Sequence, residues 1–341
     1  MSDVPLTGAG QTPVREWIAT QTRGLLRQRG HAWLLQGPSG LGQYQLALSL
    51  VRAWLCESAN EDGACGLCRS CHAIDVRANA DLYVLMPEVQ MLALGWPLSE
   101  KAQSEIDEKK RKPSKEIRVD AMRDAVEFTQ RTNSQGRGKA ILVYPAEQMN
   151  TVTANALLKT LEEPPGAVKF VLATESAHQL LPTIRSRCIG HTMQWPAADV
   201  ALRWLHACGL SGAAANVALR AAGGRPDDAL DVAQSGRNPA LWEGLRAALH
   251  RGDTSLFKDW TAPQMIDALQ KLCHDLMARQ TGANPRFFDE KDLGRPVPLA
   301  ALSDWNKALM QSSKTMDHPF NAGLMQEALV NQAKIALNCE H

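Results

Sequence analysis

The chain has 341 residues, of which 45% are hydrophobic and 21% are charged. These values are typical of a globular protein and exclude a disordered or collagen-like chain, and the length predicts two or three domains. Because 37 basic and 36 acidic residues leave a formal net charge of +1, any contact with nucleic acid is expected to be local. The first ten residues lack the basic and apolar parts of a signal peptide, and no apolar run is long enough to span a membrane. We therefore expect a cytoplasmic protein without a membrane partner.

Short apolar runs alternate with amphipathic stretches over the first half of the chain. This alternation indicates an α/β domain with a parallel sheet covered by helices. In chain order, the pattern predicts a strand at 32–36, a helix at 45–55, a strand at 80–86, a helix at 119–129, a strand at 139–144, a helix at 153–161, and strands at 169–174 and 189–194.

A segment of different character, residues 88–115, interrupts this alternation. Its second half, Lys101–Lys115, is almost wholly polar, which favours a solvated loop inserted into the domain. A DNA-contacting patch at Lys109–Lys112 is the alternative, but three nearby acidic residues partly cancel its charge. The role of the insertion stays open.

Strand signals stop after Pro196. Three short helices are predicted at residues 199–208, 213–222 and 226–233, and longer amphipathic helices follow from about residue 239. The sequence therefore predicts an α/β domain at 1–195, a small helical domain at 196–238 and a larger all-α domain at 239–341.

Four of the eight cysteines crowd into residues 56–72, at Cys56, Cys65, Cys68 and Cys71. Four thiolates with C-x-x-C spacing are the ligand set of a tetrahedral Zn²⁺ site, and such a closed site has a structural rather than a catalytic role. An iron–sulfur cluster is the metal alternative, although no Cys-Pro pair follows the run. His72 can replace Cys71 as a ligand, and spacing does not decide between them.

A glycine-rich turn follows the first predicted strand, in the setting of a phosphate-binding loop. Its glycines are Gly37, Gly40 and Gly42, but Gln43 stands where the phosphate-binding lysine is expected and Tyr44 where a small hydroxyl residue would hold Mg²⁺. The strand at 139–144 also ends without an acidic pair, and Glu147 lies further on. We interpret the loop as a degenerate phosphate site, retained as a strand-to-helix turn, and expect no ATP turnover by this chain alone.

Three further stretches have a specific order and spacing: NALLKTLEEPP at 155–165, FVLAT at 170–174 and LPTIRSRC at 181–188. They closely resemble the clamp-loader ATPases of the AAA+ class. Together with the cysteine module and the missing lysine, they resemble the delta-prime type of bacterial DNA polymerase III clamp loaders. The resemblance covers the first predicted domain and, by layout, the two helical domains.

The resemblance implies an AAA+ (RecA-like) domain with an inserted zinc module, a helical lid and a helical collar that joins five subunits in an open ring. It implies gamma or tau ATPase subunits and delta as partners, and contact with the sliding clamp and primer-template DNA through the complex. Such a loader places the clamp on primed DNA during replication, as part of a DNA-directed DNA polymerase (nucleotidyltransferase) holoenzyme.

The same resemblance assigns roles to individual side chains. Arg187, in Ser186-Arg187-Cys188, maps onto the arginine finger that reaches the ATP site of the adjacent subunit. Arg185 is close enough to share this role, but the motif places the finger at Arg187. Thr174 and Arg225 map near the two sensor positions, where without nucleotide they are relics or interface residues. The alternative functions are an active ATPase motor of a clamp or helicase loader and an independent zinc-dependent DNA-binding protein. The residues at 43 and 144 and the near-zero net charge weigh against these.

Overall fold

The computed structural model describes residues 13–234, 239–258, 260–314 and 321–339. The chain divides into two compact units, residues 1–200 and 201–341, and the boundary falls inside helix α9 (Ala198–Ala207). The first unit is α/β, whereas every regular element described after residue 207 is helical. This boundary lies a few residues after the predicted end of the α/β domain.

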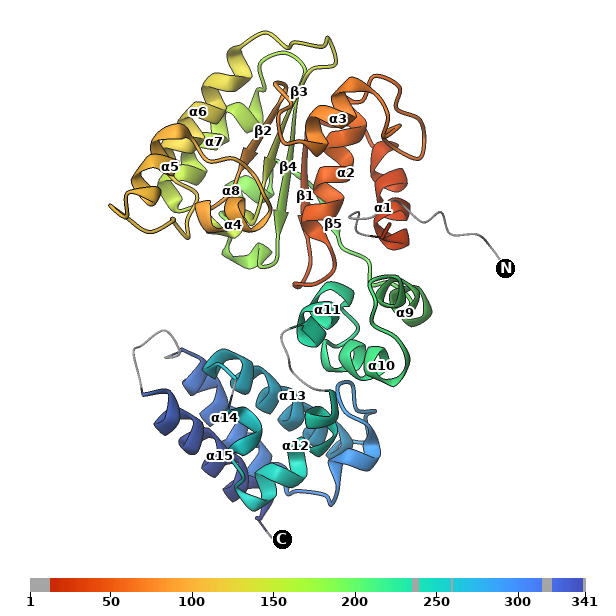
Figure 1. Ribbon diagram of the computed structural model, residues 1–341, viewed down its shortest axis with the longest axis vertical. Coiled ribbons are helices and arrows are strands. Elements are labelled where there is room, and N and C mark those ends of the chain that lie inside the picture. Colours follow the sequence, from red (N-terminus) through yellow and green to blue (C-terminus); the bar gives the residue numbers. More distant parts are fainter. Residues whose placement is uncertain (1–12, 235–238, 259, 315–320, 340–341) are drawn as a thin grey trace. The chain divides into compact units, whose positions relative to one another are not determined.

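The first unit is built on a five-stranded parallel sheet with the strand order β2-β3-β4-β1-β5 (Figure 1). Each predicted strand is confirmed, with ends shifted by at most two residues. The strands are β1 (Ala32–Gln36), β2 (Leu82–Leu85), β3 (Lys139–Val143), β4 (Val168–Thr174) and β5 (Ile189–Thr192).

Helices cover both faces of the sheet (Figure 1), which explains why β1, β3 and β4 are apolar at nearly every position. Helices α6 (Val119–Gln130) and α7 (Thr151–Glu162) pack over alternate strand residues such as Leu34 and Phe170. On the other face lies α2 (Gln43–Leu55), and α1 (Glu16–Leu26) packs against α2. Sequence patterning did not predict α1.

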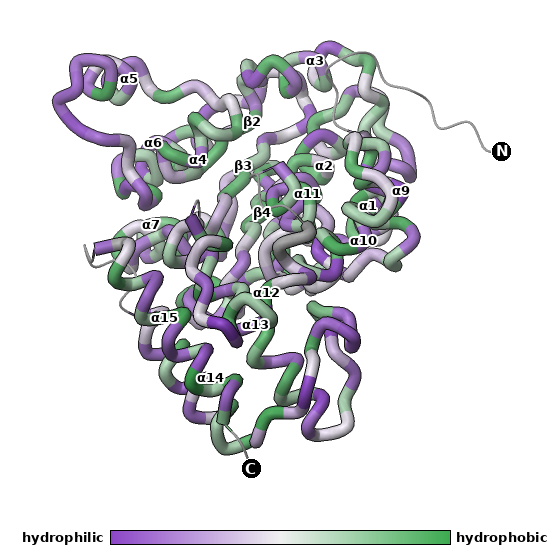
Figure 2. Tube along the Cα trace, turned by 60° about the horizontal axis from the view of Figure 1, so that its bottom comes forward, coloured by the Kyte–Doolittle hydropathy of each residue, from purple (hydrophilic) through white to green (hydrophobic). Residues whose placement is uncertain are grey.

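The insertion at 88–115 contains two helices, α4 (Glu88–Ala93) and α5 (Glu100–Asp107). Because α5 covers the first part of Lys101–Lys115, the expectation of a loop was wrong for those residues. Helix α5 buries none of its residues, and most of its tube and of the loop after it are hydrophilic in Figure 2. The Ser99 hydroxyl caps this helix by accepting the backbone N–H of Ala102. Because α5 has no buried face, its sequence has no apolar stripe from which a helix could be predicted.

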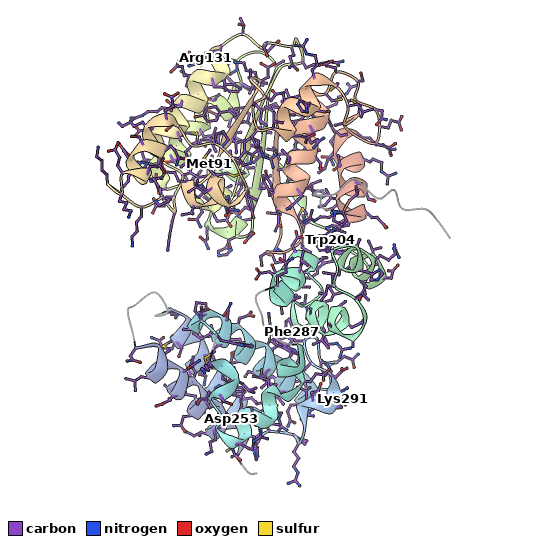
Figure 3. The ribbon with its side chains drawn as sticks, viewed as in Figure 1. Met91, Arg131, Trp204, Asp253, Phe287 and Lys291 are labelled. Carbon is purple, nitrogen blue, oxygen red and sulfur yellow. The ribbon has the colours of Figure 1, made fainter. Side chains whose placement is uncertain are left out.

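The insertion is nevertheless tied together by a buried carboxylate. Arg111 bonds both Glu88 and Glu105, and Glu88 also accepts the backbone N–H of Ser114 at 2.8 Å. The Arg111 hydrogen bond is the main cause that lowers the pKa of Glu88. A cavity of about 370 Å³ lies beside this cluster and is lined in part by Met91, which Figure 3 labels.

Among the described residues, the second unit continues with six helices and two short 3₁₀ turns. The apolar faces predicted around Leu269 and Leu329 are confirmed, because these side chains lie in one buried cluster. The helices are α10 (Gly212–Ala221), α11 (Pro226–Gln234), α12 (Pro239–Arg251), α13 (Ala262–Gln280), α14 (Leu299–Lys314) and α15 (Ala322–Leu337). Residues 235–238 are outside the described residues, and the division of this unit at 238 stays a prediction.

A buried carboxylate organises the loop between α13 and α14. Asp275 is fully buried and accepts the backbone N–H groups of Arg286, Phe287 and Phe288 at 2.7–3.0 Å. The Arg286 guanidinium in turn donates to the carbonyl of Gly223 at 3.0 Å. Phe287, labelled in Figure 3, therefore sits in a loop that joins the α10–α11 connection to the longer helices of the same unit.

Candidate functional site

The glycine-rich turn between β1 and α2 has the backbone form that its sequence predicts. Gly40 and Gly42 have φ values of 76° and 88°, a region that side-chain-bearing residues rarely adopt. Gly42 is the N-cap of α2, so the turn joins the carboxyl end of a central strand to a helix N-terminus. The five predicted loop residues, Gly37 to Tyr44, are thus brought together in one tight turn.

The side chain of Gln43 forms hydrogen bonds within the glycine-rich turn. Its amide nitrogen donates to the carbonyl oxygens of Gly37 at 2.8 Å and Pro38 at 2.6 Å, and the residue is only 2% exposed. A glutamine amide has two N–H donors, and both are engaged by these carbonyls. Gln43 therefore stabilises the turn and presents no charge to a phosphate.

Tyr44 lies in a small aromatic cluster with Trp96 and Tyr144. The Trp96 indole N–H donates to the Tyr44 hydroxyl at 2.8 Å, and the centroids of the Tyr44 and Tyr144 rings are 5.6 Å apart. Burial raises the pKa of Tyr44, opposed in part by the Trp96 hydrogen bond. Trp96 comes from the polar insertion, and sequence reasoning missed it because a single tryptophan between helices gives no periodic signal.

The end of β3 also carries no metal-binding acidic pair. Tyr144 donates its hydroxyl to Glu175 at 3.1 Å, and one oxygen of Glu147 accepts the backbone N–H of Glu175 at 3.0 Å. Thr174, the predicted sensor position, is fully buried, and its hydroxyl accepts the backbone N–H of Ser176. These polar groups bond to one another and to nearby backbone.

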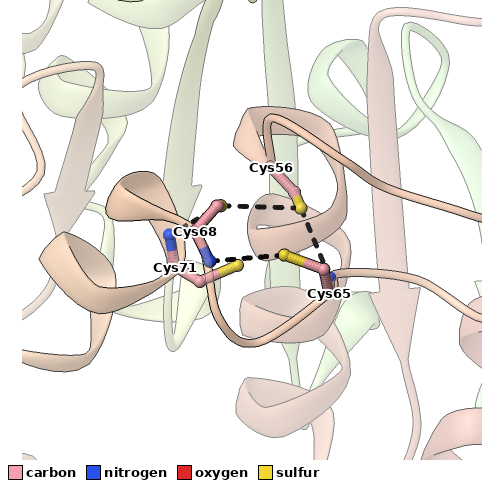
Figure 4. Close-up of side chains that lie close together, drawn as sticks. All are labelled: Cys56, Cys65, Cys68 and Cys71. Atoms are coloured by element: carbon pink, nitrogen blue, oxygen red, sulfur yellow. Dashed lines mark hydrogen bonds between the residues drawn. The ribbon is translucent and has the colours of Figure 1, made fainter.

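The four predicted cysteines converge into one cluster (Figure 4). Their sulfur atoms all lie within 4.8 Å of one another, and those of Cys56 and Cys68 are 3.8 Å apart. A tetrahedral ion with Zn–S bonds of about 2.3 Å sets its sulfurs about 3.8 Å apart, so the donor set fits zinc. Cys71 belongs to the cluster, whereas His72 is exposed and does not.

Backbone N–H groups point at these sulfurs. Cys56 Sγ accepts from Ser58 and Cys65 at 3.4 and 3.3 Å, and Cys65 Sγ accepts from Cys68 at 3.4 Å. Such bonds stabilise thiolate charge. Burial works against ionisation of Cys68, but hydrogen bonds from the backbone N–H groups of Cys71 and Glu57 lower its pKa to about 6, whereas burial raises the pKa of Cys71 to about 12. The cluster therefore resists carrying four negative charges unless a cation compensates them.

The cluster joins two helices of the first unit. Cys56 is the C-cap of α2, and Cys68 is the N-cap of α3 (Arg69–Asp75), where its sulfur accepts the backbone N–H of Cys71. Four protein ligands leave no open coordination position, so the chemistry of this donor set is that of a structural site.

Arg187 lies at the other end of the sheet from the glycine-rich turn. It follows the short helix α8 (Pro182–Arg185) and precedes the first residue of β5, which runs parallel to β1. Arg187 therefore sits at the amino-terminal edge of the sheet, and the glycine-rich turn sits at the carboxyl-terminal edge. Parallel strands of about five residues separate the edges by about 16 Å.

The Arg187 guanidinium is held by its own chain. It forms an ion pair with Glu162 at the end of α7, and Nη1 donates to the carbonyl of Thr183 at 2.9 Å. Its side chain remains 30% exposed. Arg185 is exposed, and Arg225, in the second unit, pairs with Asp228 at 2.9 Å.

The fold and this site define an AAA+ protein: a parallel sheet of order β2-β3-β4-β1-β5, a glycine-rich turn after β1, and a helical unit that follows. The family model described as DNA polymerase III, delta subunit, matches residues 21–196. The chain is 32% identical over 292 residues to DNA polymerase III subunit delta' of Pseudomonas aeruginosa, covering 85% of this chain and 74% of that protein. The chain belongs to this DNA polymerase III delta-subunit family, and its resemblance to delta-prime subunits is confirmed.

Two other similarities accompany this match. DNA polymerase III subunit tau of Escherichia coli is 33% identical over 159 residues, which covers 47% of this chain and 21% of tau. A crystal structure of a gamma subunit-related protein from Thermotoga maritima aligns over 95% of this chain and all of its own, with 16% identity and a TM-score of 0.49. Among the described residues, no helix has the length and apolarity required to cross a membrane.

Proposed function

We propose that this chain is the non-catalytic subunit of a DNA polymerase III clamp loader and donates Arg187 to the ATP site of a neighbouring subunit. Its family membership and its similarity to tau support a place in that machine. The loader would place the sliding clamp on primed DNA, as part of the polymerase holoenzyme.

The position of Arg187 is the observation that carries this proposal. The residue sits at the sheet edge opposite its own glycine-rich turn, so the guanidinium is directed away from any nucleotide bound in this chain. An arginine at this edge serves a phosphate only when that phosphate belongs to another subunit. Activity that depends on Arg187 is therefore conditional on assembly.

The chemistry follows from the charge that develops during phosphoryl transfer. Negative charge accumulates on the oxygens around the γ-phosphate, and a fixed guanidinium stabilises it through paired N–H donors. The planar guanidinium of Arg187 carries N–H donors whose geometry matches two phosphate oxygens. The subunit that holds ATP supplies the rest of the machinery.

The same proposal includes no ATP turnover by this chain. Gln43 engages both amide donors within the turn, and Tyr44 is buried against Trp96, so neither lysine charge nor a small hydroxyl faces the loop. An active motor subunit would need both features.

We further propose the assembly that the family resemblance implies. Gamma or tau subunits and delta would be the partners in a ring of five, with residues 196–238 as a lid and 239–341 as the collar. Contact with the sliding clamp and primer-template DNA would occur through the complex, and the location would be cytoplasmic.

We propose Zn²⁺ as a structural ion held by Cys56, Cys65, Cys68 and Cys71. The spacing of the sulfurs and their N–H donors support this assignment. The ion would fix the end of α2 to the start of α3 by charge compensation, and its binding free energy would contribute to folding of the module.

The function is tested by reconstituting the loader with the Arg187→Ala variant. We expect DNA- and clamp-stimulated ATP hydrolysis to fall by about 10³-fold, because arginine fingers contribute at least this much. Co-elution of the variant with its partner subunits should be unchanged, and Arg123→Ala, at an exposed arginine on α6, serves as the matched control. Full hydrolysis by a complex that contains Arg187→Ala would refute the finger.

The metal is tested by elemental analysis of protein purified without added metal. Near-equal molar zinc is expected in the natural chain and is lost in Cys56→Ser, whereas Cys208→Ser, outside the cluster, keeps it. Iron or an absence of metal in the natural chain would refute the zinc assignment.

A further inference from the structure

The contacts of Arg187 define a second residue for the proposed finger. Its Nη2 donates a hydrogen bond to the Glu162 carboxylate. Its Nη1 donates to the Thr183 carbonyl at 2.9 Å and lies 3.5 Å from the Ser186 hydroxyl. Its Nε is buried and has no hydrogen-bond partner among the described residues. Glu162 and the Thr183 carbonyl therefore fix both ends of the fork.

We propose that Glu162 is the positioning residue of the arginine finger, which it holds in the orientation needed by the phosphate of the neighbouring subunit. This inference rests on the proposed function. Glu162 comes from the last turn of α7 and Thr183 from α8, so two separate elements determine where the guanidinium lies. Glu162 acts through Arg187 and is not itself placed against the reacting atoms.

The Arg187 guanidinium has enough N–H donors both to bond Glu162 and Thr183 and to bond a phosphate. Each terminal nitrogen of arginine carries two N–H groups. The strong bonds to Glu162 and to the Thr183 carbonyl use one on each nitrogen, because the 3.5 Å separation from Ser186 is at the limit of a hydrogen bond. One N–H on each terminal nitrogen therefore remains available to form a pair of bonds with phosphate oxygens.

The pair serves orientation rather than stability. The side chains of Arg187 and Glu162 are 30% and 50% exposed, and ion pairs of this exposure contribute little to folding. A long arginine side chain that is not held loses considerable rotamer freedom when it must align with a phosphate. Because Glu162 already restricts the Arg187 side chain before phosphate binds, little rotamer freedom is lost when the guanidinium aligns with the phosphate. The effect of Glu162 is therefore expected in the rate of the chemical step.

The experiment is ATP hydrolysis by the reconstituted loader containing Glu162→Ala. We expect kcat to fall about tenfold, with the KM for ATP within about twofold, because orientation matters in the transition state. Glu162→Gln keeps one oxygen acceptor at the same reach and should restore kcat to within about threefold. The matched control is Glu163→Ala, the adjacent exposed carboxylate.

Two further measurements separate positioning from a structural role. The melting temperature of the Glu162→Ala chain should stay within about 3 °C of the natural chain. In the Arg187→Ala background, Glu162→Ala should cause no additional loss of kcat, because no finger is left to orient.

The outcomes distinguish this inference from the proposed function. If Arg187→Ala itself leaves hydrolysis unchanged, the finger is refuted. If Arg187→Ala lowers hydrolysis but Glu162→Ala does not, the finger stands and the positioning role is refuted. A rise in kcat with Glu162→Ala also refutes it, because the carboxylate then restrains the finger instead of aligning it.

Discussion

The glycine-rich turn and the Ser-Arg-Cys turn lie at opposite edges of the same sheet and hold their polar side chains in similar ways. In both, a side chain with several N–H donors bonds to backbone carbonyls of its own turn: Gln43 to Gly37 and Pro38, and Arg187 to Thr183. The difference lies in what remains free. Gln43 is 2% exposed and has no donor left, whereas the side chain of Arg187 is 30% exposed and retains one N–H group on each terminal nitrogen.

This difference shows that a glycine-rich turn can be retained after the side chains that bind phosphate have been replaced. A strand-to-helix turn needs glycines at positive φ whether or not phosphate binds, so Gly40 and Gly42 keep their place for backbone reasons. The ion pair between the partly exposed Arg187 and Glu162 contributes little to folding. Folding stability therefore does not explain why the guanidinium is held in place, whereas binding to a phosphate of a neighbouring subunit does. Substitutions at the two turns test this contrast.

After Arg187→Ala itself, the largest effect is expected for Arg187→Lys in the assembled loader. Lysine keeps the charge but lacks the planar fork, so it cannot be held by Glu162 and Thr183 while presenting paired donors. We expect kcat to fall by about 10²-fold, most of the way toward the alanine variant. The measurement is steady-state hydrolysis with DNA and clamp, with Arg123→Lys, at an exposed arginine on α6, as the control. Undiminished kcat would mean that charge alone is sufficient at this turn.

The next effect concerns the stability of the glycine-rich turn. Gln43→Ala leaves the Gly37 and Pro38 carbonyls without their donor, which should lower the free energy of unfolding of the α/β unit by about 2 kcal/mol. Gln45→Ala, on the same helix and half-buried, should lower it by less than about 0.5 kcal/mol. Urea denaturation measures both. An unchanged stability would show that Gln43 is not the residue that closes the turn.

Much of this architecture follows from sequence because its signals are periodic. The strands are continuous apolar runs between helices, and the cysteine spacing predicted the cluster, although only the structure decided between Cys71 and His72. The positions of Gln43 and Tyr44 were likewise informative, because a phosphate loop needs particular residue types there.

The remaining features depend on contacts between distant segments, which periodicity does not encode. Trp96 reaches Tyr44 across 52 positions, and Glu162 reaches Arg187 across 25. Helix α5 has no buried face, so no apolar stripe distinguished it from a loop. The family motif identified Arg187, but the carboxylate that holds it became visible only in three dimensions.

A smaller effect is expected for the hydrogen bond between Trp96 and Tyr44. Trp96→Phe and Tyr44→Phe each remove one partner, and their double-mutant cycle should give a coupling of about 1 kcal/mol in the free energy of unfolding. Hydrolysis by the loader should not change with either variant, because the aromatic cluster lies away from Arg187. A coupling near zero would indicate that the insertion does not support the turn.

The smallest effect is the pH dependence contributed by Tyr44. Because burial raises its pKa above 10.0 in the folded chain, the unfolded chain releases this proton first as the pH rises. Tyr44 therefore contributes stability that is fully present below pH 10 and is lost as the pH rises from there through the folded pKa. Unfolding free energies above pH 10 should fall more steeply for the natural chain than for Tyr44→Phe. This comparison isolates Tyr44 from Tyr83 and the cysteines, which titrate in both chains. Equal slopes of unfolding free energy against pH would show that water reaches the Tyr44 hydroxyl. The glycine-rich turn would then be exposed to solvent next to Tyr44, as the Ser-Arg-Cys turn is next to Arg187.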